Sequence, residues 1–147
     1  MPFETKAFGA QDALTQALKN TAELAAWTVD FGIPSRREEL HMWVDESVDS
    51  WGQGTPTTGL VMRDETFRLT VFIYARRTGS DAKEIRDEIK QAADVVTGVI
   101  GSEPFLGGAV FHAQIDSAEY ASAFADAEGR SREAVMQLMI KCSAYLA

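Results

Sequence analysis

The sequence predicts an α+β fold, in which a mixed or antiparallel β-sheet of about five strands is packed by two helices on one face. Two periodicities support this prediction. Apolar residues recur at every second position in several segments, as in strands, and at spacings of three and four in two others, as in helices. The 147 residues also suit one domain, residues 1–147, because a chain of this length can bury its own core. No internal repeat or interdomain linker is visible.

The stretch from residue 65 to residue 101 is the centre of the prediction, and it begins with a strand. One face of this strand is apolar and carries Phe67, Leu69, Val71, Ile73 and Ala75. The other face is mixed and carries Arg68, Thr70, Phe72, Tyr74 and Arg76. We therefore expect a central strand that is buried on one face and partly buried on the other.

A long amphipathic helix is expected directly after this strand. Its apolar stripe consists of Ile85, Ile89, Ala92, Ala93, Val96 and Ile100. Ser80 is the expected N-cap, and Asp81 and Glu84 suit the positive end of the helix. Gly101 and Pro104 are expected to end it.

The first third of the chain predicts one helix and two short strands. Residues 10–26 are rich in alanine and form a narrow apolar stripe, which indicates a helix. Residues 27–33 and 39–46 alternate as strands do. We expect these two strands to pair through a turn at residues 34–37.

Residues 47–62 are expected to form one long excursion loop, because three glycines and one proline fall within this stretch. Trp51 is its most informative residue. An exposed tryptophan is the kind of anchor that a partner interface buries, but a tryptophan in a loop can equally fold back over the edge of the core. Both interpretations stay open at this stage.

The last third of the chain predicts two further strands. Residues 107–116 alternate, and so do residues 133–145, which are expected to close the sheet. The intervening residues 117–132 are compatible with a loop, a helical turn or a strand. Together with the loop at residues 47–62, they are candidates for protrusions that contact a partner.

Charge and composition narrow the function classes. The net charge of −8 argues against a nucleic-acid binder, which needs a basic surface, and it permits a surface past which DNA slides without binding. No apolar run is long enough to cross a membrane, and the first residues lack the apolar centre of a signal peptide. We therefore expect synthesis in the cytoplasm, with which a single cysteine agrees.

No residue pattern predicts a catalytic, metal or cofactor site, so we expect a protein that is not an enzyme. His41 with Asp45 lacks a third ligand, and His112 fits a hydrogen-bonded sheet edge. Cys142 lies among apolar residues, as a buried thiol does. The glycines at positions 52, 54 and 59 do not form a phosphate loop. Neighbouring carboxylates such as Asp64 with Glu65 are expected to be solvated.

Interface residues are the remaining candidates. Six arginines fall at expected strand ends or loops, where they can pair with acidic groups of another subunit: Arg36, Arg37, Arg76, Arg77, Arg130 and Arg132. The candidate interface set combines the excursion loop with four of these arginines and consists of Trp51, Gln53, Thr55, Thr57, Arg76, Arg77, Arg130 and Arg132.

The order of elements over residues 10–147 resembles that of the tail terminator, or tail completion, proteins of long-tailed bacteriophages. The resemblance rests on ETFRLTVFIYARR, on TGSDAKEIRDEIKQAADVV leading into the long helix, and on the ending GRSREAVMQLMIKCSAYL. It implies a structural virion protein without catalytic residues, made in the host cytoplasm and placed at the head-proximal end of the tail. It also implies a ring, typically a hexamer, that binds the tail tube protein and the head-tail connector and lets DNA pass through its bore.

An alternative function belongs to a different class. A small ligand-binding module or enzyme could use the faces that carry His41 and His112 together with the central sheet. The histidines distinguish the two hypotheses, because only this alternative needs them at a site.

Overall fold

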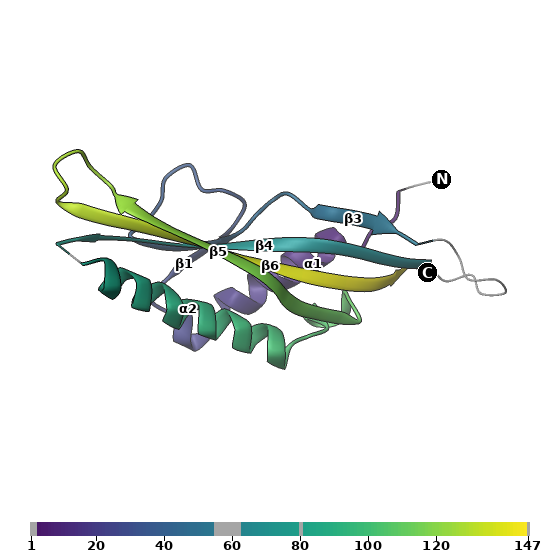
Figure 1. The fold of residues 1–147 in the computed structure, drawn as a ribbon. Coiled ribbons are helices and arrows are strands. Elements are labelled where there is room, and N and C mark those ends of the chain that lie inside the picture. The colour runs from purple at the N-terminus through teal and green to yellow at the C-terminus, as the bar shows by residue number, and fades with distance from the viewer. Residues whose placement is uncertain (1–2, 55–62, 80, 147) are drawn as a thin grey trace.

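A long antiparallel pair of strands, β4 (Arg63–Thr78) and β6 (Ser131–Leu146), lies at the centre of the molecule (Figure 1). The computed structural model describes residues 3–54, 63–79 and 81–146. The remaining elements are α1 (Ala7–Lys19), η1 (Ala22–Leu24), β1 (Thr28–Phe31), β2 (Leu40–Val44), β3 (Asp49–Gln53), α2 (Ala82–Ser102), η2 (Leu106–Gly108) and β5 (His112–Phe124).

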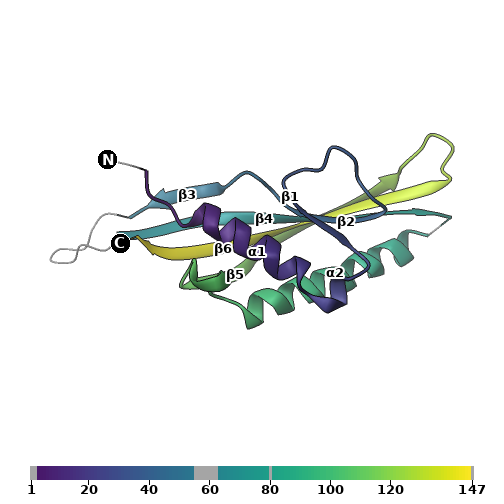
Figure 2. The same cartoon turned by 180° about the vertical axis from the view of Figure 1, so that it is seen from behind.

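The sheet has six strands in the order β1-β2-β4-β6-β5, and β3 pairs with the first half of β4. All pairs are antiparallel except β1 with β2, which is parallel. The helices α1 and α2 pack on one face, as the two opposite views show (Figures 1 and 2). The predicted α+β class, with a mixed sheet and two helices on one face, is therefore confirmed.

The core lies between the helices and this face of the sheet. The alternating residues of β4 are buried as predicted, and Phe67, Leu69, Val71, Ile73 and Ala75 are each at most 1% exposed. The stripe of α2 packs onto them with Ile85, Ile89 and Val96 fully buried. Both periodicities thus identified the apolar faces of β4 and α2 that pack together. Burial of the apolar area of these two faces stabilises the contact between the helix and the sheet.

The N-cap of helix α2 lies one residue later than expected. Asp81 is the N-cap, and its Oδ1 accepts a hydrogen bond of 2.7 Å from the backbone N–H of Glu84. A carboxylate satisfies this free N–H, and its negative charge interacts favourably with the positive end of the helix dipole. Ser80, the expected cap, lies outside the described residues.

The predicted first helix is wrong at both ends. Helix α1 starts at Ala7 and ends at Lys19, and a separate 3-10 turn follows at Ala22–Leu24. Asn20 caps α1: its backbone N–H bonds to the carbonyl of Gln16, and the N–H of Thr21 bonds to the carbonyl of Leu18. The alanines beyond this point favour a helix locally, but the chain has to turn there to enter β1.

The expected hairpin between the first two strands is also wrong, because β1 and β2 run parallel. Residues 32–39 leave the end of β1 at Gly32 and return beside its start, so that Thr28 pairs with His41. Gly32 has a φ of 83°, a conformation that favours glycine, and its N–H bonds to the carbonyl of Val44. The connection therefore forms a loop over the sheet rather than a tight turn.

The stretch 47–62 is not one loop, because Asp49–Gln53 forms β3 against β4. The reason is the length of β4, which extends beyond β2 and offers the edge of its first half to another strand. The rest of the expected loop, residues 55–62, lies outside the described residues.

The last two strands differ in length from their predictions. Strand β5 begins at His112, because Gly107 and Gly108 have φ values of 66° and 89° and belong to the turn η2. It then continues to Phe124. The segment 117–132, for which the sequence allowed a loop, a helical turn or a strand, is therefore mostly strand followed by a turn. Strand β6 confirms the predicted closing strand and starts two residues earlier.

Candidate functional site

Trp51 lies on β3 and is partly buried against the core. Its indole N–H donates a hydrogen bond of 2.9 Å to Oε2 of Glu65. Its ring packs edge-on against Phe3 and Phe8, with centroid distances of 5.4 and 5.7 Å. Of the two open interpretations, the structure favours the one in which Trp51 covers the edge of the core.

Glu65 is fully buried, which corrects the expectation of a solvated carboxylate. Its Oε1 accepts a hydrogen bond of 2.7 Å from the backbone N–H of Lys6, the N-cap position of α1. Its Oε2 accepts hydrogen bonds from Trp51 and, at 3.4 Å, from Nε2 of Gln53. A buried carboxylate is tolerated when such donors surround it, so Glu65 joins α1, β3 and β4.

Gln53 is exposed, and besides Glu65 its Nε2 reaches the carbonyl of Glu4 at 2.9 Å. Thr55 and Thr57 lie outside the described residues. The part of the candidate interface that the structure describes on β3 therefore holds the N-terminal segment in place.

The four candidate arginines lie together at the opposite end of the sheet, where β4 ends and β6 begins. Arg77 pairs with Arg132 and Arg76 with Glu133 in the strand register, and Arg130 precedes β6. The guanidinium of Arg77 binds Glu88 of α2 bidentately, and this hydrogen bond raises its pKa. The guanidinium of Arg132 lies 4.3 Å from the ring centre of Phe124. Arg76 is exposed.

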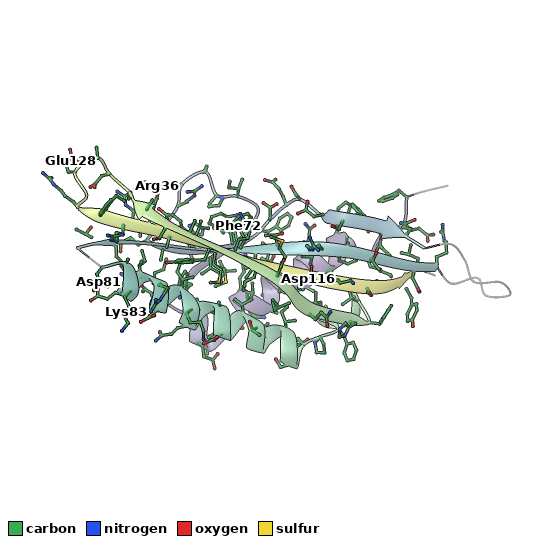
Figure 3. All side chains as sticks on the ribbon, in the orientation of Figure 1. Arg36, Phe72, Asp81, Lys83, Asp116 and Glu128 are labelled. Atoms are coloured by element: carbon green, nitrogen blue, oxygen red, sulfur yellow. The ribbon has the colours of Figure 1, made fainter. Side chains whose placement is uncertain are left out.

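The face of the sheet that the helices leave open carries the clearest cavity. Figure 3 shows Phe72 projecting from the sheet on the side opposite to α2, with Arg36 on the loop 32–39 above it. The cavity between this loop and the sheet has a volume of about 310 Å³. Its lining includes Ile33, Arg37, Trp43, Phe72, Tyr74 and Glu133.

Aromatic and charged groups share this cavity. Trp43 stacks on Phe72 with a centroid distance of 5.2 Å. The guanidinium of Arg37 lies 5.6 Å from the ring centre of Trp43 and 5.2 Å from that of Tyr74. The Tyr74 hydroxyl donates a 2.9 Å hydrogen bond to Glu133. Burial, followed by this contact with Glu133, raises the pKa of Tyr74.

The two histidines do not form a common site. His41 is buried, and its Nε2 lies 2.7 Å from Oδ2 of Asp30 while its Nδ1 accepts the N–H of Glu38. It thus joins β1 to the loop that leads into β2. His112 is exposed, lies across from Ser143 on β6, and contacts Gln114. On β4, Tyr74 is the partner of His41, whereas Thr66 is the partner of Ser143, the residue across from His112. Because Tyr74 and Thr66 are well separated along β4, the two imidazoles lie far apart along the sheet.

Cys142 is fully buried, and burial raises the pKa of its thiol to about 12. A thiol with this pKa holds its proton at neutral pH and is a poor nucleophile. Within residues 3–54, 63–79 and 81–146, no group of three or more His, Cys, Asp and Glu side chains is arranged to hold a metal ion. In the same part of the chain, no helix is both long and apolar enough to span a membrane.

Comparison of the chain with models of known protein families and with curated protein sequences finds no match.

Sequence reasoning missed both Glu65 and the cavity. The position of Glu65 was a usable signal. It precedes Phe67 and Leu69 at intervals of two residues, so its side chain lies on the same, buried face of β4. The cavity gave no such signal, since it forms only where residues of the loop 32–39 meet residues of β2, β4, β5 and β6.

Proposed function

We propose that this protein is a structural component of a phage virion, a tail terminator that assembles into a homo-oligomeric ring, typically a hexamer. In this role the ring ends the tail tube, offers a joining surface to the head-tail connector, and surrounds the path of the DNA. The protein is made in the host cytoplasm and works at the head-proximal end of the tail.

The observation that carries the proposal is the contrast between a well-anchored body and a projecting, exposed end. The hairpin formed by β5 and β6 extends away from the chain termini, with Glu128 near its tip (Figures 1 and 3). Along its outer strand, residues 117–124 are all exposed, and Tyr120 and Phe124 are 39% and 56% exposed. Exposed apolar groups on a projecting element suit contacts between subunits.

The charge of the chain also supports this role. The net charge of −8 suits a ring through which DNA passes without binding, because acidic groups repel phosphates. The arginines Arg76, Arg130 and Arg132 lie near the projecting end, where they can meet acidic groups of a neighbouring subunit.

The test combines the purified protein with tubes assembled from a phage major tail protein. We expect rings at one end of the tubes in electron micrographs, and a protein mass in the tube fraction of several times 16.1 kDa per ring. A Phe124→Asp variant, which keeps the buried core, should join tubes less well, and Asp12→Asn serves as a surface control. A protein that never joins tube ends in any condition would overturn the proposal.

The cavity on the open face favours a second candidate function, a small ligand-binding module. Its aromatic walls and the guanidinium of Arg37, which has no ion pair among the described residues, suit a small anionic ligand with an apolar body. A screen of aromatic carboxylates by tryptophan fluorescence tests this role, with Arg37→Gln as the variant. Binding that Arg37→Gln abolishes, without any joining to tubes, would favour this function over the tail role.

A further inference from the structure

The outer edge of β5 is free in the described structure. Strand β5 is the last in the order β1-β2-β4-β6-β5, and it pairs with β6 on its inner side. The backbone N–H of Ala125 donates a 2.9 Å hydrogen bond to the carbonyl of Ser131. Because antiparallel strands alternate between bonded and non-bonded residues, this bond sets the alternation along the continuous register from Ser117 to Phe124. The outward backbone groups therefore belong to Ala118, Tyr120, Ser122 and Phe124.

This edge lacks the features that usually prevent edge pairing. Proteins protect free edges with lysine, proline, bulges or covering segments. In β5 the register shift lies between Ile115 and Ser117, before the exposed stretch. Residues 117–124 read SAEYASAF, with Glu119 as the one charged residue, no lysine and no proline. A regular, exposed edge of this kind is suited to pairing with another strand.

We propose that β5 pairs with β5 of a second copy of this chain, antiparallel and about a twofold axis at Ala121. The two sheets then join into one continuous sheet across the dimer. The outward groups of the four residues on each copy become the ladder between the two chains. This proposal concerns the free protein and does not depend on its role in a tail.

The side chains of β5 fit this register. With the axis at Ala121, Tyr120 lies opposite Ser122 of the second copy, and Phe124 lies opposite Ala118. Each aromatic ring thus meets a small side chain. On the other face the two Ala121 methyl groups meet at the axis, where the non-bonded pair brings the chains closest.

The charge pattern fits the same register. Glu119 lies opposite Ala123 of the second copy, so the two carboxylates are kept apart. An axis at Glu119 would instead place the two carboxylates opposite each other, which is unfavourable. The register at Ala121 also uses the whole exposed stretch from Ala118 to Phe124.

This dimer has a consequence for the proposed ring. A ring that binds a tube on one face and a connector on the other has different faces, so it contains no twofold axes between its subunits. The β5 pair therefore belongs to the protein before assembly, and it has to separate when the ring forms. In this way the dimer protects the edge until a tube is present.

A disulfide at the axis tests the register. In the Ala121→Cys variant the two introduced thiols face each other at a Cα separation of about 4.5 Å, within the range for a disulfide. We expect a covalent dimer of twice 16.1 kDa on a non-reducing gel after mild oxidation. The native Cys142 is fully buried and does not interfere.

The matched control is Ala123→Cys, which lies on the same face of β5 but opposite Glu119 of the second copy. We expect at least tenfold less covalent dimer from it than from Ala121→Cys. Equal crosslinking of the two variants, or none from Ala121→Cys at concentrations where the protein is dimeric by light scattering, would overturn the register.

A proline tests the ladder itself. Ser122→Pro removes an outward N–H and leaves every hydrogen bond to β6 in place, so the monomer should keep its circular dichroism. We expect its dimer dissociation constant to rise at least tenfold, while Ser122→Val, which keeps the N–H, should stay dimeric. A native protein that is monomeric at all concentrations, or a folded Ser122→Pro that dimerises as the native protein does, would overturn the proposal.

Discussion

The two ends of the sheet differ in how they are held. At the end with the chain termini, the buried carboxylate of Glu65 accepts hydrogen bonds from Lys6, Trp51 and Gln53, and it joins three elements. At the other end, β5 and β6 project beyond the helices as a hairpin whose outer strand is exposed (Figure 2). A buried carboxylate is thus satisfied by hydrogen bonds at one end, while the outer strand of the hairpin is exposed along residues 117–124 at the other.

This difference separates stability from function in the molecule. A buried carboxylate with several donors makes a region sensitive to substitution, because each lost partner leaves a buried group unsatisfied. An exposed strand tolerates substitution in the monomer, because little area is buried there. Substitutions at the anchored end should therefore lower the stability of the protein, and those at the hairpin should affect contacts with other chains.

The largest effect is expected at Glu65. Glu65→Ala leaves the Lys6 and Trp51 donors without their acceptor and should lower the free energy of unfolding by about 3 to 5 kcal/mol. Urea denaturation measures it, and Asp64→Ala, at the exposed neighbouring position, is the control. Equal stability of the two variants would show that the terminal end is not anchored by this carboxylate.

A smaller effect is expected at Trp51. Trp51→Phe keeps an aromatic ring beside Phe3 and Phe8 but removes the donor to Glu65, and should cost about 1 to 2 kcal/mol. Trp27→Phe is a suitable control, because Trp27 also packs partly buried against the core. Unchanged stability together with a loss of assembly would instead restore Trp51 as an interface anchor.

Tyr74 lies between the two ends, and its effect depends on pH. Tyr74→Phe removes the hydrogen bond to Glu133 and should cost about 1 kcal/mol near neutral pH. The pKa of Tyr74 is raised from 10.0, so the folded state favours the neutral phenol. Its contribution is complete below the unfolded pKa of 10.0 and is lost as the pH rises through the folded pKa.

The measurement for Tyr74 is therefore urea denaturation of both proteins at neutral pH and above the unfolded pKa. We expect the advantage of the native protein over Tyr74→Phe to shrink at the higher pH. Tyr145→Phe, at a half-exposed position, controls for general alkaline effects. A difference that grows with pH would contradict the burial of the Tyr74 phenol.

The smallest effect on stability is expected at Phe124. This side chain is 56% exposed and contacts the Arg132 guanidinium, so Phe124→Ala should change the free energy of unfolding of the monomer by less than about 0.5 kcal/mol. Thermal unfolding at low protein concentration measures it. A loss of more than about 1.5 kcal/mol would mean that the hairpin is as firmly held as the terminal end.

The elements with strong periodicity could be predicted from the sequence. The buried face of β4, the stripe of α2 and the strand β6 all follow from the spacing of apolar residues, because a side chain's face depends on its position within a single element. The direction of β1 against β2 and the existence of β3 could not be predicted in this way. They depend on which edge is free beside them, and a short segment carries no information about its neighbour.

The candidate interface also has one part that the sequence predicted and one part that only the structure decided. The sequence predicted Arg76, Arg77, Arg130 and Arg132 at strand ends or loops, and the structure brings them to one end of the sheet. The sequence alone could not distinguish the two interpretations of Trp51, because both place a tryptophan in a polar, glycine-rich segment. Only the burial of Glu65 and its hydrogen bond to Trp51 decide between them.

By itself, the sequence determined the class of fold, the faces that form the core and the acidic character of the surface. These properties follow from local spacing and from composition, which are present in the chain before it folds. The tertiary structure decided the parallel pairing of β1, the buried carboxylate at one end and the free β5 edge at the other. Each of these depends on segments distant in sequence that meet when the sheet forms, and no local pattern specifies which neighbours they meet.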